Sequence, residues 1–112
     1  ILESGWGTSR FARDHNNYYG IHCFTKNCGI KAAGADVYLE EFDSINQSKL
    51  GYYKMVNTGG SFTEFRNIRS NKNKIGIEVI DTLDTYSELE SNEYSERLLL
   101  IINQNNLSKY ND

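Results

Sequence analysis

Several features that define large protein classes are scarce or absent in this sequence. No run of about 18 apolar residues occurs, so no helix is expected to cross a bilayer. Basic residues are in deficit, with a net charge of −3, which disfavours a nucleic-acid-binding protein because phosphate recognition leaves a basic footprint. Only His15 and His22 accompany the two cysteines, too few ligands for a metal site. We therefore expect no membrane span, no nucleic-acid partner, no metal and no cofactor.

The length and composition are typical of one small globular domain. The chain has 112 residues, of which 24% are charged and 38% hydrophobic, as in soluble folded proteins. It begins Ile1-Leu2-Glu3, without Met or a leader, so the N-terminus looks cut and says nothing about compartment. Cys23 and Cys28 enclose four residues, and the spacing fits either a small disulfide loop in an exported protein or two free thiols.

The first half of the chain alternates short elements with glycine-rich loops. Residues 1–4 resemble the last turn of a helix, which two glycines then end. A short helix capped by Thr8 or Ser9 is expected to follow. Residues 18–35 show no periodicity and predict a loop or an irregular hairpin, whereas the alternation in residues 37–42 predicts a strand.

The second half of the chain is helical in character. Asp43 or Ser44 is expected to cap a helix. The expected inward face of that helix carries Ile45, Tyr52, Tyr53 and Val56. Residues 75–83 fit a strand or a helix, and residues 93–105 predict an amphipathic helix. The chain is therefore predicted to be a single domain, mostly α with a small β element.

The stretch Glu3-Ser4-Gly5-Trp6-Gly7 is the best candidate for chemistry. A carboxylate in the last turn of a helix faces the negative end of the helix dipole, which disfavours its ionised form. Trp6 can exclude water and favour the neutral acid further. Glycoside cleavage needs such a protonated carboxylic acid to protonate the leaving oxygen. The residues alone fit equally an exposed glutamate before a glycine turn.

Two boxes in the first 21 residues carry a resemblance to a known family. Residues 1–9 read Ile-Leu-Glu-Ser-Gly-Trp-Gly-Thr-Ser, and residues 16–21 read Asn-Asn-Tyr-Tyr-Gly-Ile. Together they resemble the boxes Glu-Ser-(Gly/Ala)-aromatic-Gly and Asn-Asn-x-aromatic-Gly of the glucosaminidase family, glycoside hydrolase family 73, a mannosyl-glycoprotein endo-β-N-acetylglucosaminidase-like domain. Similarity to the Bax-like branch extends over residues 28–30, 42–44, 65–69 and 83–106, and so over nearly all 112 residues.

This resemblance implies both an architecture and an activity. The expected fold is α+β and lysozyme-like, with a mainly helical lobe and a small β lobe beside a glycan cleft. The expected reaction is hydrolysis of the β-1,4 bond after N-acetylglucosamine in peptidoglycan, with Glu3 as general acid. Trp6 is expected to stack on sugar or to pack the end of the acid's helix. The substrate-binding positions that the resemblance implies are Trp6, Asn17, Tyr19, Gly20 and Tyr94.

The chain departs from the family's pattern in two places. Many members carry a second Glu in a strand after the second box, but residues 21–28 hold no carboxylate. The possible second carboxylates are Glu40 and Glu41, which alternate faces of the expected strand, so at most one can point into a cleft. The family's helix before Glu3 is also missing, and four residues cannot hold a helix alone. We therefore expect the N-terminal helical segment to be truncated in this chain of residues 1–112.

These departures leave the mechanism open. An inverting route needs a base about 6.5–9.5 Å from the acid, with water between them. A substrate-assisted route uses the sugar's own N-acetyl oxygen and needs only an acid plus a group such as Tyr94 or Asn17 to orient the amide; the single clear acid favours it slightly. The rivals are an endoglycosidase on the chitobiose core of N-glycans and a catalytically inactive glycan-binding domain. The expected location is periplasmic, cell-envelope or secreted, and no oligomeric state is predicted.

Overall fold

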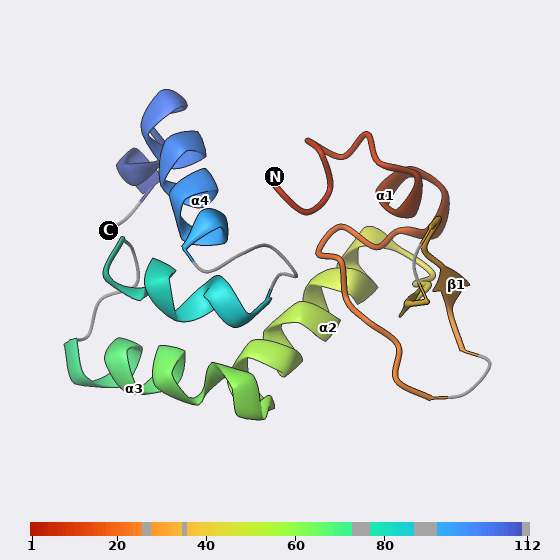
Figure 1. The fold of residues 1–112 in the computed structure, drawn as a ribbon, viewed down its shortest axis with the longest axis horizontal. Helices are drawn as coiled ribbons and strands as arrows, with labels where there is room; N and C mark the ends of the chain where they lie inside the picture. Colours follow the sequence, from red (N-terminus) through yellow and green to blue (C-terminus); the bar gives the residue numbers. More distant parts are fainter. Residues whose placement is uncertain (26–27, 35, 73–76, 87–91, 111–112) are drawn as a thin grey trace. The chain divides into compact units, whose positions relative to one another are not determined.

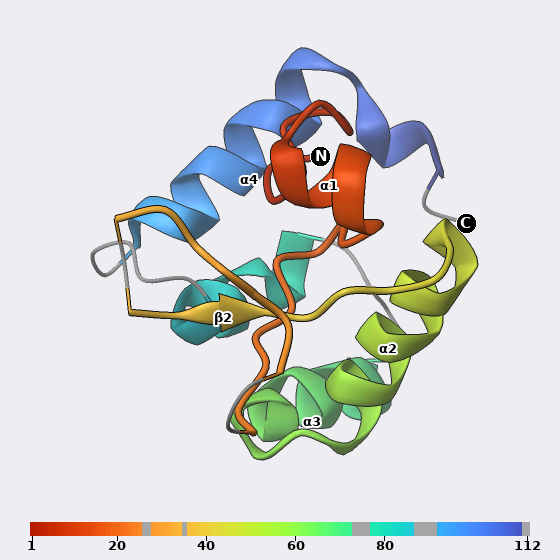
Figure 2. The same ribbon diagram turned by 90° about the vertical axis from the view of Figure 1, so that its right-hand side faces the viewer.

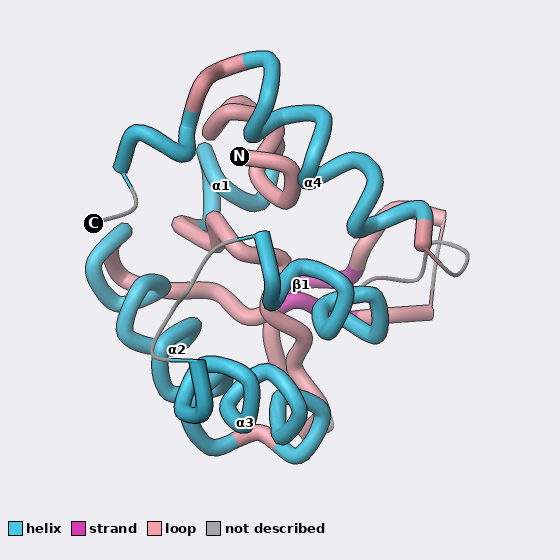
Figure 3. The backbone as a smooth tube through the Cα atoms, turned by 90° about the vertical axis from the view of Figure 1, so that its left-hand side faces the viewer, coloured by secondary structure: helices cyan, strands magenta, loops and turns pink. Residues whose placement is uncertain are grey.

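The computed structural model describes residues 1–25, 28–34, 36–72, 77–86 and 92–110. They belong to two compact units, residues 1–54 and residues 55–112, each of which is described by itself. Helices dominate the second unit, whereas the first unit combines turns and loops with α-helices (Figure 1), and the described strands form one small sheet, coloured magenta in Figure 3. The fold class is therefore α+β and mostly helical, consistent with the lysozyme-like class that the sequence predicts. Within the described residues, no helix is long and apolar enough to span a membrane.

The first unit opens with a helix-ending turn. The backbone N–H of Trp6 donates to the carbonyl of Ile1 at 3.1 Å, and Gly5 is left-handed with φ of 57°. This pair of features defines a Schellman-type helix end, in which glycine is favoured because it has no Cβ. The hydroxyl of Ser4 accepts from the N–H of Gly7 at 3.0 Å and fixes the turn. Glu3 therefore has the position expected of a last-turn residue, while an upstream helix stays a prediction.

Helix α1 follows directly and spans Arg10–His15. Ser9, rather than Thr8, is its N-cap, because its hydroxyl accepts from the N–H of Ala12 at 3.1 Å. Asn16 ends the helix in the left-handed conformation with φ of 57°, which asparagine tolerates better than most residues. The short helix that the sequence predicts is confirmed.

The sheet consists of β1, Ile30–Lys31, and β2, Tyr38–Leu39, paired antiparallel with Ile30 opposite Leu39. The strand predicted over residues 37–42 is thus present but shorter, as Figure 2 shows for β2. The reason lies in the hydrogen bonds of the following residues. The N–H of Glu40 donates to the carbonyl of Ile21, next to an isolated antiparallel β-bridge between His22 and Leu39, and the N–H of Phe42 donates to the carbonyl of His15 at the end of α1. Neither bond continues the ladder between β1 and β2.

Helix α2, Ile45–Thr58, begins in the first unit and ends in the second (Figure 1). Ser44 caps it, because its hydroxyl accepts from the N–H of Gln47 at 3.2 Å. The predicted inward face was wrong in part, since Ile45 is 43% exposed and Tyr53 61% exposed. The face turned away from solvent instead carries Ser48, Tyr52 and Val56, which are spaced four residues apart along the helix.

The second unit is entirely helical in its described residues. After α2 it contains the 3-10 helix η1 (Gly60–Phe62), α3 (Thr63–Lys72), η2 (Ile77–Tyr86), α4 (Glu93–Gln104) and η3 (Leu107–Tyr110). Its core comprises Val56, Phe62, Phe65, Val79, Ile80 and Tyr94. The guanidinium of Arg66 donates to the carbonyls of Val56 and Gly59 at 2.9 and 2.8 Å, and so closes the end of α2. The segment 75–83, for which the sequence fits a strand or a helix, is helical from Ile77 onward. Residues 75–76 of this segment lie outside the described residues, as do residues 87–91 of the segment 83–106 that resembles the Bax-like branch.

Candidate active site

Glu3 and Gly20, from the two sequence boxes, lie against each other in the first unit. A Cβ added to Gly20 would lie 2.8 Å from Oε2 of Glu3 and 3.7 Å from its Cδ. Gly20 also has φ of 64°, a conformation that favours glycine. The second box therefore passes directly over the half-buried carboxylate of the first box. A side chain at residue 20 would displace the Glu3 carboxylate and strain the backbone.

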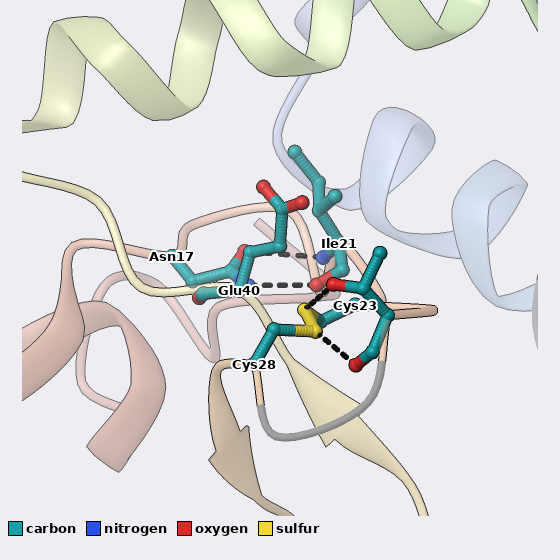
Figure 4. The surroundings of a disulfide bond; sticks show 6 residues. Asn17, Ile21, Cys23, Cys28 and Glu40 are labelled. Atoms are coloured by element: carbon teal, nitrogen blue, oxygen red, sulfur yellow. Dashed lines mark hydrogen bonds between the residues drawn. A yellow bond between two sulfur atoms is a disulfide. The ribbon is translucent and has the colours of Figure 1, made fainter.

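Asn17 holds the loop that carries Gly20. Its amide nitrogen donates to the carbonyls of Ile21 and Glu40 at 3.0 and 2.9 Å. Its amide oxygen accepts from the N–H groups of Tyr19 and Ile21 at 3.3 and 3.1 Å. The residue is 1% exposed, so no polar atom remains to contact a sugar. Asn17 therefore has a structural role, and Figure 4 shows its amide bonded to Ile21. The substrate-binding role that the resemblance implies for Asn17 stays a prediction.

Tyr19 forms an aromatic stack beside the carboxylate with a residue that the sequence analysis assigned to the core. The rings of Tyr19 and Tyr52 lie 4.4 Å apart and within 10° of parallel. The pKa of the Tyr52 phenol is raised mainly by burial, and further by Tyr19, by the charge of Glu3 and by Tyr53. The pKa of the Tyr19 phenol is raised mainly by burial and further by Tyr53. Both phenols therefore stay neutral hydrogen-bond donors at physiological pH.

Helix α2 can deliver Tyr52 to this point because of Gly51. A Cβ on Gly51 would lie 3.1 Å from Cε1 of Phe42, which is tighter than most side-chain contacts, and 3.6 Å from Cδ1 of Ile21, which is an ordinary contact. The helix therefore packs tightly on the segment that contains the second box. No spacing in the sequence signals this approach, since it joins residues about 30 positions apart.

Trp6 is 62% exposed and left-handed, with φ of 58°. A left-handed conformation costs a non-glycine residue about 1–2 kcal/mol, so the surrounding turn must enforce it. Of the two interpretations of this side chain, its exposure favours a surface for sugar stacking over packing of the helix end.

Glu40 and Glu41 lie beyond the end of β2, where the alternation of a strand no longer applies. Both residues line a pocket of about 380 Å³. The expectation that at most one of them faces a cleft assumed that the strand continues through both residues, but β2 ends at Leu39. The carboxylate of Glu41 pairs with Nδ1 of His15 and is mostly exposed. Glu40 is half-buried, and its backbone is bonded to Ile21, the residue after Gly20.

A disulfide joins Cys23 and Cys28 (Figure 4), whose Cα atoms are 6.1 Å apart. Both cysteines line the same pocket as Glu40 and Glu41. A loop this short contributes local shape more than global stability, because loop-closure entropy grows with loop length. Among the described residues, no group of three or more His, Cys, Asp or Glu side chains could hold a metal ion.

Tyr94 belongs to the second unit, on α4, and is 5% exposed. The structure brings Glu3, Tyr19 and Gly20 together within the first unit. For Tyr94, a position facing the substrate stays a prediction.

Comparisons with known proteins agree with the two sequence boxes. The family model named Glucosaminidase, with the description mannosyl-glycoprotein endo-beta-N-acetylglucosaminidase, matches residues 1–107 of the chain. Protein bax of Escherichia coli (strain K12) is 36% identical over 80 residues, which are 71% of this chain and 29% of that protein. The chain thus spans less than a third of the length of this curated relative. No solved structure matches the chain significantly.

Proposed function

Because this chain belongs to the glucosaminidase family, we propose that it hydrolyses the β-1,4 bond after N-acetylglucosamine in bacterial peptidoglycan. Membership of this family supports the general activity, which is hydrolysis of a glycan. The close approach of Gly20 to Glu3 joins the two family boxes around one carboxylate, and it is the observation that supports Glu3 as the acid of this reaction. Peptidoglycan lies outside the cytoplasm, so a periplasmic, cell-envelope or secreted location is part of this proposal. The Cys23–Cys28 disulfide is compatible with such an oxidising compartment.

Glu3 acts as the general acid in this mechanism. Its carboxyl group would protonate the glycosidic oxygen as the bond to the leaving sugar breaks. Gly20 places backbone alone against one side of the carboxyl group, so the substrate has to reach the acid from another side. The exposed ring of Trp6 supplies a stacking surface for a sugar near the same turn.

Glu40 is the better candidate for the second carboxylate. The loop of residues 17–21 touches Glu3 through Gly20 and bonds the backbone of Glu40 through Ile21, at 2.9 Å. Asn17 adds a second bond to the Glu40 carbonyl. Glu41 is instead committed to His15. In the substrate-assisted alternative no base is needed, and a group other than the amide of Asn17 has to orient the N-acetyl group, because that amide is already bonded.

Substitution of the two glutamates separates these routes. If Glu40 activates water, Glu40→Gln should lower kcat by about 10²–10⁴-fold, the usual contribution of a general base, while Glu41→Gln should lower it less than threefold. The measurement is kcat on purified sacculi, with circular dichroism to verify folding. Small losses in both variants would favour the substrate-assisted route. A larger loss in Glu41→Gln would overturn the choice of Glu40.

Gly20→Ala tests whether the loop positions the acid. The new methyl group would collide with the Glu3 carboxylate, and displacing a catalytic group by about 1 Å can cost 100-fold in rate. Gly34→Ala is a matched control, because Gly34 has φ of 75° but open space around it. Both variants are expected to lose similar stability from left-handed strain, about 1–2 kcal/mol. Equal activities of the two variants, measured well below their melting temperatures, would contradict the proposed contact.

The substrate is tested by comparing two glycans. The chain should release reducing ends from purified sacculi, with N-acetylglucosamine at each new end. Cleavage of a high-mannose glycopeptide but not of sacculi would favour the N-glycan chitobiose core, the linkage suggested by the family's description. Binding of either glycan without any release of reducing ends would instead identify an inactive binding domain.

A further inference from the structure

The two residues on either side of Gly20 both pack against one short segment of helix α2. On one side, the ring of Tyr19 stacks on that of Tyr52, 4.4 Å away and within 10° of parallel. On the other side, a Cβ on Gly51 would lie 3.6 Å from Cδ1 of Ile21, so that side chain packs against the helix. Two consecutive residues of α2 therefore hold both neighbours of the glycine that lies against the acid.

The stack adds a restraint that differs from the backbone bonds of the loop. The amide oxygen of Asn17 accepts from the N–H groups of Tyr19 and Ile21 at 3.3 and 3.1 Å. Those bonds fix the shape of the loop, because donors and acceptor all belong to residues 17–21. The stack instead ties the loop to α2. It is directional, because aromatic pairs prefer particular separations and angles between their rings.

Tyr52 differs in its surroundings from Tyr53, its neighbour along the helix. Tyr52 is half-buried, whereas Tyr53 is 61% exposed. The Tyr53 ring meets that of Tyr52 at 6.3 Å and 47°, so it lies at the edge of the stack and not within it. Burial above all raises the pKa of the Tyr52 phenol, which is neutral at physiological pH. What Tyr52 brings to the loop is therefore a flat, uncharged ring.

We propose that Tyr52 is a positioning residue, whose stack holds the loop of residues 17–21 against Glu3 and so orients the acid. The inference rests on the proposed function, since it gives α2 a part in protonating the leaving oxygen. Gly20 lies against the carboxyl group, so a displaced loop changes the space in which that group is held. A catalytic group misplaced by about 1 Å can cost about 100-fold in rate, and the smaller shift allowed by loss of one stack is expected to cost about tenfold.

Substitutions of the two adjacent tyrosines test this role. Tyr52→Leu should lower kcat on purified sacculi about tenfold and leave KM within about twofold, because the orientation of the acid matters only as the bond breaks. Tyr52→Phe keeps the ring and should restore kcat to within about twofold of wild type. Tyr53→Leu is the matched control and should also stay within about twofold. Tyr52→Met retains apolar volume without a flat ring, should behave like Tyr52→Leu, and replaces it if that variant does not fold.

The leaving group provides a readout that a general weakening of the fold would not move. Dinitrophenolate departs as a stable anion, so the rate on a dinitrophenyl β-glycoside of N-acetylglucosamine does not depend on a general acid. The loss in Tyr52→Leu should therefore be about tenfold on sacculi and less than about twofold on the activated glycoside. Both rates are measured below the melting temperature of the variant.

Three results would overturn the positioning role while leaving the proposed function intact. They are equal losses of Tyr52→Leu on the two substrates, unchanged activity of that variant on sacculi, and an equal loss in Tyr52→Phe, which would assign the effect to the hydroxyl group. Failure of the wild-type chain to release reducing ends from sacculi would instead overturn the proposed function, and this inference with it.

Discussion

Glu3→Gln should lower the rate of glycan hydrolysis by about 10²–10⁴-fold while leaving the fold and glycan binding nearly intact. That range is the usual contribution of a general acid, and glutamine cannot supply the proton. The amide has nearly the size of the carboxyl group, so the close contact with Gly20 is retained. The loss should appear in kcat rather than in KM, because the proton is needed only as the bond breaks.

The measurement is release of reducing ends from sacculi, with glycan binding and thermal melting recorded on the same samples. Glu64→Gln is a suitable control, since Glu64 is exposed on the first turn of α3 in the second unit. This control should remain within about twofold of wild-type activity. A loss of less than about tenfold in Glu3→Gln would rule out the assignment of the acid.

The features that the sequence predicted best are those with a local cause. Ser9 and Ser44 cap the helices that follow them because a side-chain oxygen reaches an N–H three residues on. Gly5 ends the first turn because it adopts the left-handed conformation without cost. In each case the pattern and its physical reason lie within about six consecutive residues. The α+β class follows from such elements taken together.

The features that the sequence did not predict depend on contacts between distant segments. Residues 40–42 alternate like a strand, but the N–H groups of Glu40 and Phe42 donate to Ile21 and His15 and not to β1, and β2 ends at Leu39. Tyr52 and Tyr53 are adjacent and equally aromatic, yet only the rotation of the helix makes one stack on Tyr19 and leaves the other exposed. Periodicity indicates that a face exists without identifying its partner.

Asn17 shows how a motif residue can serve a site without touching its ligand. The sequence analysis expected a sugar contact because Asn17 falls on the second box of the family that the chain resembles. All four hydrogen bonds of the amide instead go to backbone groups of residues 19, 21 and 40. This amide therefore ties the loop over Glu3 to the segment that carries Glu40. Its role could not be read from the sequence, because the Glu40 carbonyl is 23 residues away.

Asn17→Ala should consequently be the most destabilising single change in the first unit. The variant leaves backbone donors and acceptors unpaired in a site that is 1% exposed, and each such group costs about 1–3 kcal/mol. Partial relaxation and hydration reduce the sum to about 3 kcal/mol. At about 4–8 °C per kcal/mol for a domain of this size, the melting temperature should fall by roughly 12–24 °C. Differential scanning calorimetry measures this shift directly.

Two further variants distinguish the hydrogen bonds of Asn17 from a general sensitivity of the loop. Asn16→Gly removes a single bond to Phe42 and keeps a residue that accepts φ of 57°, so it should cost only about 1 kcal/mol. Asn17→Asp keeps both acceptor bonds but sets a carboxylate against the carbonyls of Ile21 and Glu40. That variant should be more stable at acid pH, where a protonated carboxyl group can donate to one of them. Equal melting temperatures for Asn17→Ala and Asn16→Gly would mean that the amide of Asn17 does not hold the loop. Below its melting temperature, Asn17→Ala should still be less active than Asn16→Gly, because Gly20 is no longer fixed over Glu3.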